Sequence, residues 1–297
     1  MLSNEDVISY LQKLDSRSAD TIICDPPYFR CVKDDWDNQW FVMQDWVDWC
    51  EKWIEELGRV AKWSCSFWLF GMPHQLTQLL PICEKHGFTF RQQIVINKGM
   101  QAVAGRTSKK LKMFPTATEH LYYFHYEARN HIRDLLQEQR KLHGMNGNAV
   151  NSLMGKATSG GGAFACMASM KKPLEHRVYP TRDDWIKLSN TFVLPNYDDV
   201  AYYFDLPSGL TDVWDDINFY DRSITKFHST QKPIKLIERL IQCSTLPNQL
   251  ILDPFMGSGT TAVVANSMNR KWIGTEINES YFVQANQRIL NATLANC

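Results

Sequence analysis

The most distinctive chemistry in this chain follows a short apolar run at residues 21–24 and consists of Asp25, Pro26, Pro27 and Tyr28. The two prolines fix φ and remove two backbone donors, so the chain turns rigidly where the strand ends. A carboxylate and carbonyl oxygens are acceptors that can hold an amino group, and an aromatic ring can stack on a flat base. Taken alone, the same four residues are also compatible with a tight turn that has no chemical role.

A second chemical motif lies near the other end of the sequence, where a strand-like run at residues 250–252 leads into Asp253-Pro254-Phe255-Met256-Gly257-Ser258-Gly259-Thr260-Thr261. The two glycines remove side chains where a cofactor must approach the backbone, and the helix that follows offers free N–H groups. A second strand at residues 271–275 is followed by Glu276. An acid at that point of a βαβ unit can accept hydrogen bonds from ribose hydroxyls. No lysine follows the glycines and a third glycine is absent, so neither a P-loop nor a nicotinamide-binding motif is matched.

These two motifs, together with the segment His228-Ser229-Thr230-Gln231-Lys232-Pro233 that precedes the second, resemble the amino-DNA methyltransferases. That family transfers methyl from S-adenosylmethionine to the exocyclic nitrogen of adenine or cytosine. The order of the motifs, catalytic first and cofactor-binding last, matches the permuted subgroup called the β class, of the kind found with type II restriction systems. The resemblance covers about residues 1–125 and 225–297, and three motifs in the right order are much more specific than one.

The resemblance implies an α/β fold, namely a Rossmann-like methyltransferase domain with a mostly parallel central sheet and an inserted target-recognition region. The sequence agrees with this, because segments of helical spacing, such as residues 41–62, alternate with strand-like runs at residues 21–24, 66–70, 88–96 and 119–124. We therefore expect three regions: a catalytic half at residues 1–125, a variable target-recognition region at 126–225 and a cofactor-binding half at 226–297.

The family's functional residues match positions in all three motifs. The resemblance implies that the catalytic residues are Asp25, Pro26, Pro27 and Tyr28. It implies that the cofactor-binding residues are Glu5, Asp6, Asp25, Lys232, Asp253, Phe255, Gly257, Ser258, Gly259, Thr260, Glu276 and Asn278. Family members often carry Gly-Asp ahead of the first helix, whereas this chain has Asn4-Glu5-Asp6. The role of holding the cofactor's adenine is therefore open between Glu5 and Asp6.

The expected mechanism follows from the chemistry of an exocyclic amino group, which is a poor nucleophile because its lone pair is delocalised into the ring. If Asp25 and the carbonyl of Pro26 accept both N–H bonds, the nitrogen moves toward a tetrahedral shape and its lone pair becomes free. The sulfonium then delivers methyl in line, so positioning and electrostatics carry the acceleration without a covalent enzyme intermediate. A base in duplex DNA must be flipped out, and we expect Tyr28 to stack on it.

Two alternatives concern the substrate and the activity. Asp at the first position of the catalytic motif is usual in N6-adenine enzymes of the family and Ser in N4-cytosine enzymes, so adenine is favoured and cytosine is the alternative. A non-catalytic nucleic-acid-binding protein on a decayed methyltransferase fold is a further alternative, against which the intact residues Asp25, Tyr28, Gly257, Gly259 and Glu276 argue. Methylation of RNA or free bases is disfavoured, because residues 126–225 are numerous enough to read a duplex.

The net charge of the chain is zero, with 32 Lys+Arg and 32 Asp+Glu, but the charges are unevenly distributed. Residues 98–187 hold 15 basic and 7 acidic side chains, which leaves 17 basic and 25 acidic ones in the remainder. A basic stretch suits contacts with DNA phosphates, and the alternative is a solvated loop with incidental charge. The predicted DNA-binding residues form the densest basic run, Lys98, Arg106, Lys109, Lys110 and Lys112.

Composition excludes several other classes of protein. The sequence has no apolar run of 18 residues and its first residues do not resemble a signal peptide, so we expect a cytoplasmic protein without a membrane partner. The eight cysteines show no Cys-x-x-Cys spacing, so they are interpreted as reduced core residues and no metal site is expected. The expected cofactor is S-adenosylmethionine. The expected partner is double-stranded DNA, and the resemblance adds a cognate restriction endonuclease and a homodimer as options.

Overall fold

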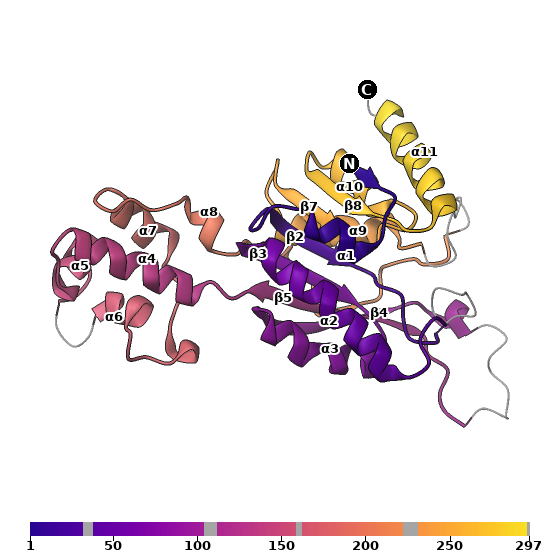
Figure 1. The fold of residues 1–297 in the computed structure, drawn as a ribbon, viewed down its shortest axis with the longest axis horizontal. Coiled ribbons are helices and arrows are strands. Elements are labelled where there is room, and N and C mark those ends of the chain that lie inside the picture. Colours follow the sequence, from indigo (N-terminus) through magenta and orange to yellow (C-terminus); the bar gives the residue numbers. More distant parts are fainter. Residues whose placement is uncertain (32–37, 104–111, 159–161, 222–230, 296–297) are drawn as a thin grey trace. The chain divides into compact units, whose positions relative to one another are not determined.

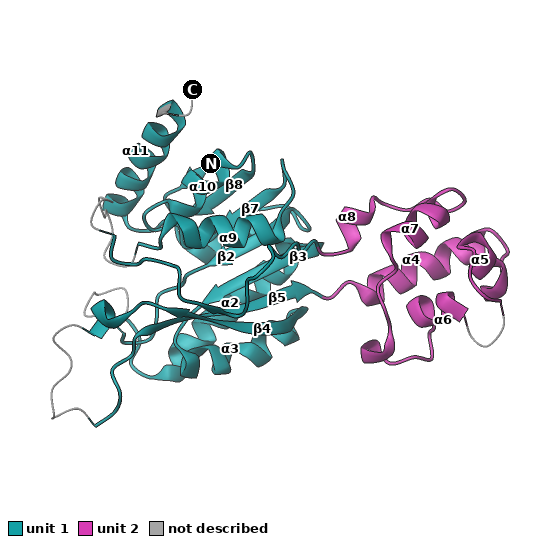
Figure 2. Cartoon of the chain, turned by 180° about the vertical axis from the view of Figure 1, so that it is seen from behind, with its two compact units in different colours: residues 1–126, 203–297 teal, residues 127–202 magenta. Residues whose placement is uncertain are grey.

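The computed structural model describes residues 1–31, 38–103, 112–158, 162–221 and 231–295. The chain forms two compact units, of which unit 1 comprises residues 1–126 and 203–297 and unit 2 comprises residues 127–202 (Figure 2). Unit 2 is thus an insertion in the sequence of unit 1. Both chemical motifs belong to unit 1.

Unit 1 is built on an eight-stranded sheet in the order β1-β8-β7-β2-β3-β5-β4-β6 (Figure 1). The strands are β1 (Leu2–Ser3), β2 (Ala19–Cys24), β3 (Ala61–Phe70), β4 (Phe88–Asn97), β5 (Thr118–Tyr126), β6 (Val213–Trp214), β7 (Leu250–Asp253) and β8 (Lys271–Thr275). Every pairing is parallel except those of β5, which runs antiparallel to both β3 and β4. The predicted α/β class with a mostly parallel sheet is confirmed, with one reversed strand.

Helices cover both faces of this sheet, because consecutive strand residues are buried on opposite sides. Ile22 of β2 and Phe67 of β3 pack in one core with α1, α2 and α3, whereas Ile23 and Trp68 pack in a second core with α9 and α10. The helices of unit 1 are α1 (Val7–Gln12), α2 (Met43–Val60), α3 (Pro73–Lys85), α9 (Ile234–Ser244), α10 (Thr260–Ser267) and α11 (Glu279–Ala295), with a short 3₁₀ helix, η2 (Met100–Val103). The helical spacing of residues 41–62 therefore gives α2, whose Trp46 and Trp53 are fully buried.

The centre of the sheet joins the two ends of the sequence. Thr21 and Ile22 of β2 pair in parallel with Ile251 and Leu252 of β7. Asp20, near the start of β2, stabilises this register. Its carboxylate accepts a hydrogen bond from the backbone N–H of Leu250 at 2.8 Å and forms an ion pair with Lys62 at 2.8 Å. Because parallel neighbours end at the same edge of a sheet, both chemical motifs lie at one edge.

Unit 2 consists of short helices around an apolar core of its own. The helices are α4 (Arg129–Leu142), α5 (Gly147–Leu153), α6 (Gly162–Ala168), α7 (Arg182–Ser189) and α8 (Tyr197–Val200), with the 3₁₀ helix η3 (Leu174–His176). Its fully or nearly fully buried apolar side chains include Ile132, Leu136, Val150, Met154, Met167, Trp185 and Leu188. A target-recognition role for residues 126–225 stays a prediction.

No helix in the described part of the chain combines the length and apolar character needed to cross a membrane.

Candidate functional site

The turn after β2 is held from below by two side chains, which present Asp25 at the carboxyl edge of the sheet. The indole N–H of Trp46 donates to the carbonyl of Pro27 at 2.9 Å, and the side-chain amide of Gln75 donates to the carbonyl of Phe29 at 2.9 Å. Trp46 comes from α2 and Gln75 from α3, so the helices of one face fix this turn. These two hydrogen bonds hold the turn in place, and the Asp25 carboxylate at its start remains 26% exposed.

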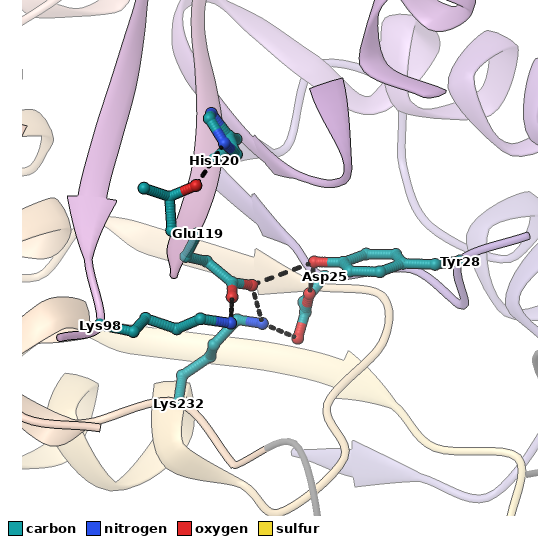
Figure 3. A network of polar contacts seen from close by, with 7 residues as sticks. Asp25, Tyr28, Lys98, Glu119, His120 and Lys232 are labelled. Atoms are coloured by element: carbon teal, nitrogen blue, oxygen red, sulfur yellow. Dashed lines mark hydrogen bonds and ion pairs between the residues drawn. The ribbon is translucent and has the colours of Figure 1, made fainter. Parts of the chain in front are cut away.

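Both oxygens of the Asp25 carboxylate are engaged (Figure 3). The hydroxyl of Tyr28 donates to Asp25 Oδ1 at 2.8 Å, and Lys232 Nζ lies 2.8 Å from Asp25 Oδ2. Lys232 also sits over the ring of Phe70, 4.7 Å from its centroid, at the end of β3. The aromatic ring thus adds a cation–π contact to the ion pair.

A second carboxylate, Glu119, faces this group from β5 (Figure 3). Its Oε1 atom lies 3.0 Å from Lys232 Nζ and 3.3 Å from the Tyr28 hydroxyl, and its Oε2 atom lies 2.9 Å from Lys98 Nζ. Because β5 runs antiparallel to its neighbours, its second residue reaches the edge where the parallel strands end. The reversed strand therefore places an acid beside the catalytic motif.

Five of the side chains drawn together in Figure 3 include two carboxylates and two ammonium groups. We call them the catalytic cluster: Asp25, Tyr28, Lys98, Glu119 and Lys232. Burial alone would raise the pKa of Glu119, but the charges of Lys232 and Lys98 outweigh it and lower that pKa to about 2. Burial alone would lower the pKa of Lys232, but Asp25 and Glu119 outweigh it and raise that pKa above its ordinary value. Glu119 and Lys232 therefore stay charged at neutral pH and compensate one another.

The loop after β7 turns on glycines with left-handed backbone. Gly257 has φ 52° and Gly259 has φ 75°, and Gly259 caps the start of α10. A Cβ on Gly257 would meet only open space apart from the carbonyl of Phe255 at 3.9 Å, whereas a Cβ on Gly259 would press on Ala285 at 3.2 Å. Gly257 thus leaves backbone accessible to a ligand, and Gly259 is needed for packing against α11.

Glu276 joins this loop to the end of β8. Its carboxylate accepts the backbone N–H of Gly257 at 2.9 Å through Oε2 and that of Asn278 at 2.8 Å through Oε1. Burial raises the pKa of Glu276, although these two hydrogen bonds oppose the change. Gly274, two residues earlier and within β8, has no room for a side chain, because its Cβ would lie 2.3 Å from the carbonyl oxygen of Asp253.

Asp253, at the end of β7, is a buried carboxyl group whose hydrogen-bond donors are neutral. Its Oδ1 atom accepts the backbone N–H of Phe255 at 3.1 Å, and Thr261 donates a further hydrogen bond. Burial raises the pKa of Asp253 to about 7, and the negative charges of Asp25 and Glu276 act in the same direction. The Asp253 carboxyl is therefore close enough to Asp25 and Glu276 for their charges to affect its pKa.

The remaining predicted cofactor-binding residues border the same loop or the end of β1. Asp6 caps α1, since its carboxylate accepts the backbone N–H groups of Ile8 at 3.0 Å and Ser9 at 3.2 Å. Glu5 forms an ion pair with Lys13. Arg288 of α11 donates to the hydroxyls of Ser258 at 3.2 Å and Thr260 at 2.9 Å. Phe255 packs edge-on against the buried ring of Trp53, with centroids 5.4 Å apart.

Asp253 and Glu276, which we call the acidic pair, fit a cationic ligand. Among the described residues, no lysine, arginine or histidine forms an ion pair with either carboxyl group. A buried acid without a cationic partner gains stability when a positive charge binds nearby. A ligand that carries an ammonium or sulfonium group and ribose hydroxyls matches this set of acceptors. The residues present therefore fit S-adenosylmethionine.

The structure places the predicted DNA-binding residues differently from one another. Lys98 belongs to the catalytic cluster and is 23% exposed, whereas Lys112 is exposed. Arg106, Lys109 and Lys110 lie outside the described residues, as do His228, Ser229 and Thr230 of the middle motif. A phosphate-binding role for these lysines and for Arg106 stays a prediction.

Glu119 is the residue of the site that sequence reasoning missed. It lies at the start of residues 119–124, a run that is apolar or aromatic after His120 and that the sequence identified only as a strand. A charged residue at the end of a buried strand is a signal in itself, because its charge must find partners. The same strand carries His120, which hydrogen bonds Thr118 and Gln93 at 2.9 and 2.8 Å.

The chain is similar to known DNA methyltransferases in sequence and in fold. A family model described as a DNA methylase of the N6/N4 type matches residues 19–287. M.HinfI of Haemophilus influenzae, a type II methyltransferase, is 24% identical over 96% of this chain and 66% of its own length. The type II methyltransferase M1.MboII of Moraxella bovis is 27% identical over 93% and 91%. The DNA adenine methyltransferase YhdJ of Escherichia coli K12 is 26% identical over 96% and 80%.

Solved structures share the fold at lower sequence identity. The complex of M1.HpyAVI with SAM aligns with a TM-score of 0.56 and 18% identity, over 97% of this chain and 98% of that one. The cytosine-N4-specific PvuII DNA methyltransferase aligns with a TM-score of 0.59 and 15% identity, over 99% and 90%. Both unit 1 and the sequence inserted into it fall within these alignments.

Proposed function

This chain belongs to the N6/N4 family of DNA methylases, and from that premise we propose that it transfers methyl from S-adenosylmethionine to the N6 amino group of adenine in duplex DNA. The observation that carries the proposal is the position of Asp25. This acceptor for an amino group lies at the end of β2, beside the strand whose Asp253 opens the cofactor loop. The methyl acceptor and the methyl donor can therefore meet at one edge of the sheet.

The cofactor half of the site would hold S-adenosylmethionine through the acidic pair and the loop glycines. When bound, this cofactor supplies an electrophilic methyl group on a positively charged sulfur. Glu276 would accept ribose hydroxyls, and Gly257 would let the ligand approach the backbone. The buried carboxyl of Asp253 would compensate positive charge. Phe255 and the cap of α10 at Gly259 would keep the loop in shape.

The catalytic half would draw the target amino group into position. Asp25 and the carbonyl of Pro26 accept its two N–H bonds, which removes the lone pair from conjugation with the ring. Lys232 keeps the Asp25 carboxylate oriented from the opposite side, with an Nζ–Oδ2 distance of 2.8 Å. The extruded base stacks on Tyr28, and the proton lost from nitrogen after transfer passes to an acceptor in the cluster or to water. Positioning carries the acceleration, so no nucleophilic side chain is required.

Adenine is proposed over cytosine for two reasons. The catalytic motif begins with Asp25, which is the usual residue in N6-adenine enzymes of this family. A relative described as a DNA adenine methyltransferase, YhdJ, is 26% identical over most of this chain. N4-cytosine is the second candidate, because a cytosine-N4-specific enzyme shares the fold. The names of two relatives also support a partnership with a type II restriction endonuclease.

The test is to express the intact chain and an Asp25→Ala variant in cells that lack other DNA methyltransferases and to digest their DNA to nucleosides. Mass spectrometry should find N6-methyladenine only with the intact chain. N4-methylcytosine in its place would overturn the choice of base but keep the mechanism. If neither modified base appears while purified protein binds S-adenosylmethionine, methylation of DNA is the wrong function.

A further inference from the structure

Glu119 touches every polar side chain of the catalytic cluster except Asp25 itself. It contacts Lys232 and Tyr28 through Oε1, and Lys98 through Oε2. Its side chain is only 12% exposed, although it is charged. An acid buried to this degree must be compensated, and here two lysines do so. None of the three motifs of the sequence contains this residue.

Among the described residues, two carboxylate oxygens lie within hydrogen-bond reach of the Tyr28 hydroxyl, which has one hydrogen to donate. Its oxygen lies 2.8 Å from Asp25 Oδ1 and 3.3 Å from Glu119 Oε1. A phenol can donate only one hydrogen bond at a time, so the two carboxylates compete for it. The shorter distance shows that Asp25 is the main acceptor when no base is present. In that arrangement Tyr28 occupies an oxygen to which the amino group of a base has to bind.

Exchange of this hydrogen bond needs a second acceptor close at hand. If the Tyr28 hydroxyl left Asp25 without a new partner, a partly buried donor would lose its hydrogen bond. Glu119 Oε1 removes this cost, because a small rotation of the hydroxyl hydrogen redirects the donation from one carboxylate to the other. Lys232 lies within 3.0 Å of both carboxylates and allows the two negative charges to remain near each other.

Resting on the proposed function, we propose that Glu119 is a positioning residue that receives the Tyr28 hydroxyl when the target amino group binds Asp25 Oδ1, and that it seats Lys232 against Asp25 Oδ2. Glu119 does not touch the base or the cofactor in this proposal. It acts by releasing one oxygen of Asp25 and by holding the cation on the other. The proposal thus deepens the mechanism at the same site and leaves cofactor binding outside its scope.

The main test is a double-mutant cycle between Glu119 and Tyr28, measured with a DNA duplex that contains a methylatable site. Glu119→Ala should lower kcat about 10- to 100-fold, while the Kd for S-adenosylmethionine changes less than about threefold. Tyr28→Phe removes the hydroxyl, so no exchange is needed in that background. Glu119→Ala should therefore cost at least about fivefold less there than in the wild type. Equal losses in the two backgrounds would overturn the exchange.

Two further variants separate the exchange from a merely structural role. Glu119→Gln keeps a side-chain oxygen that can accept the hydroxyl, so it should retain more kcat than Glu119→Ala. Lys235→Met removes a lysine whose partner is Asp216, outside the cluster, and it should change kcat by less than about threefold. If Glu119→Gln loses as much kcat as Glu119→Ala, or if Lys235→Met is as damaging as Glu119→Ala, the loss of kcat reflects weakened packing and ion pairing, and the proposal is wrong.

The pH dependence of kcat gives a readout that holds even if Glu119→Ala does not fold. Lys232 faces Asp25, Glu119 and Tyr28 and lines a small pocket together with Asp221, and Lys98 binds the other oxygen of Glu119. Removal of the Glu119 charge takes away one of the two carboxylates that raise the pKa of Lys232. In Glu119→Gln, the fall of kcat at alkaline pH should therefore begin at least about one pH unit lower.

The same pH measurement in the Tyr28→Phe background assigns the change to Lys232. Burial and the neighbouring carboxylates raise the pKa of Tyr28 well above its ordinary value, so the phenol is the other group that loses a proton at high pH. If the alkaline shift disappears in Tyr28→Phe, or if Glu119→Gln shows none, Glu119 does not seat Lys232. A wild-type protein without activity on any duplex would instead contradict the proposed function itself, and cofactor affinity, measured separately by calorimetry, distinguishes the two failures.

Discussion

The catalytic cluster and the acidic pair, the two halves of the site, hold their carboxylates in opposite electrostatic environments. In the catalytic cluster, Asp25 and Glu119 are each paired with lysine, and the pKa of Glu119 falls to about 2. In the acidic pair, Asp253 and Glu276 take hydrogen bonds from backbone and hydroxyl donors, and the pKa of Asp253 rises to about 7. The two halves meet where β2 and β7 pair in the same sheet.

This difference matches the charges of the two reactants. A nucleobase is neutral, and a site that is already balanced can bind it without a change in local charge. S-adenosylmethionine carries a sulfonium and an ammonium group, and a site with uncompensated acids attracts it. In the proposed function, the sheet thus separates its two ligands by charge, even though the whole chain has a net charge of zero.

The largest effect should come from the amino-group acceptor. Asp25→Ala is expected to lower kcat by at least about 10³-fold, because it removes the group that frees the lone pair, while cofactor affinity stays within about threefold. Single-turnover kinetics and calorimetry measure the two quantities. If Asp25→Ala also abolishes cofactor binding, the separation into two halves fails.

Loss of charge balance in the catalytic cluster should be seen as loss of stability. Lys232→Met leaves the carboxylates of Asp25 and Glu119 to face each other with only Lys98 nearby, and should lower the free energy of unfolding by about 3 kcal/mol. Lys235→Met is the matched control, since Lys235 is 58% exposed and pairs with Asp216 at the surface. Urea unfolding followed by circular dichroism compares them. Equal stability of the two variants would mean that the cluster is not balanced by Lys232.

Removal of one member of the acidic pair should affect the cofactor rather than the base. Glu276→Ala is expected to raise the Kd for S-adenosylmethionine about 10- to 100-fold, because it removes a charged acceptor and the ligand of the Gly257 N–H group. At saturating cofactor, kcat should change only a few-fold. Glu279→Ala, at the exposed start of α11, is the control. A normal Kd in Glu276→Ala would place the ribose elsewhere.

The raised pKa of Asp253 predicts that cofactor-free protein becomes less stable as pH rises. The pKa of this carboxyl is 3.8 in the unfolded chain and rises to about 7 in the folded protein, because the group is buried. Its contribution is fully present below the unfolded value, declines through the window between the two, and is lost above about 7. The slope is at most about 1.4 kcal/mol per pH unit. Thermal melts from pH 5 to 8 measure it.

Two controls sharpen this pH prediction. Asp253→Asn cannot titrate, so its melting temperature should vary less over the same range. S-adenosylmethionine should bind more tightly as pH rises through about 7, because the ionised carboxyl favours a cation. Calorimetry in buffers of different ionisation enthalpy should then detect proton release on binding. The prediction is contradicted if wild type and Asp253→Asn show the same dependence on pH.

The smallest effect should come from removing one of the lysines predicted to bind DNA phosphates. Lys112 is exposed, so Lys112→Ala should weaken DNA binding a few-fold and reduce the slope of log K against log salt by about 0.9. Lys98 already has a carboxylate partner, and Lys98→Ala should change that slope less. Fluorescence anisotropy with a labelled duplex at several salt concentrations distinguishes the two. A larger slope change for Lys98 would return it to the phosphate-binding residues.

Local patterns in the sequence were enough to predict most of unit 1. The strands at 21–24, 66–70 and 88–96 and the helix at 41–62 follow from periodicity, because a buried face repeats within a few residues. That the motifs around Asp25 and Asp253 share an edge follows from the geometry of parallel strands, and the structure confirms the parallel pairing.

The remaining features depend on tertiary structure. Glu119 reaches the site only because β5 runs antiparallel to its neighbours. The periodicity of a sequence does not reveal the direction of a strand in the sheet, so this residue was not predicted. Lys98 belongs to a basic run that indicated DNA, but its partner comes from a different strand. The helices of unit 2 were not predicted because several are too short to show a period; α5 and α6 have 7 residues each and α8 has 4.

The pairing of β2 with β7 has a consequence for synthesis on the ribosome. Asp20 and Leu250, which clamp this pairing, are separated by 230 residues. At about 5–20 residues per second, roughly 10–50 s pass between their emergence. During that time one side of β2 has no partner strand, and such an edge invites pairing with other chains. Nascent protein should therefore depend on chaperones more than its modest size suggests, and methylation can begin only after β7 has been made.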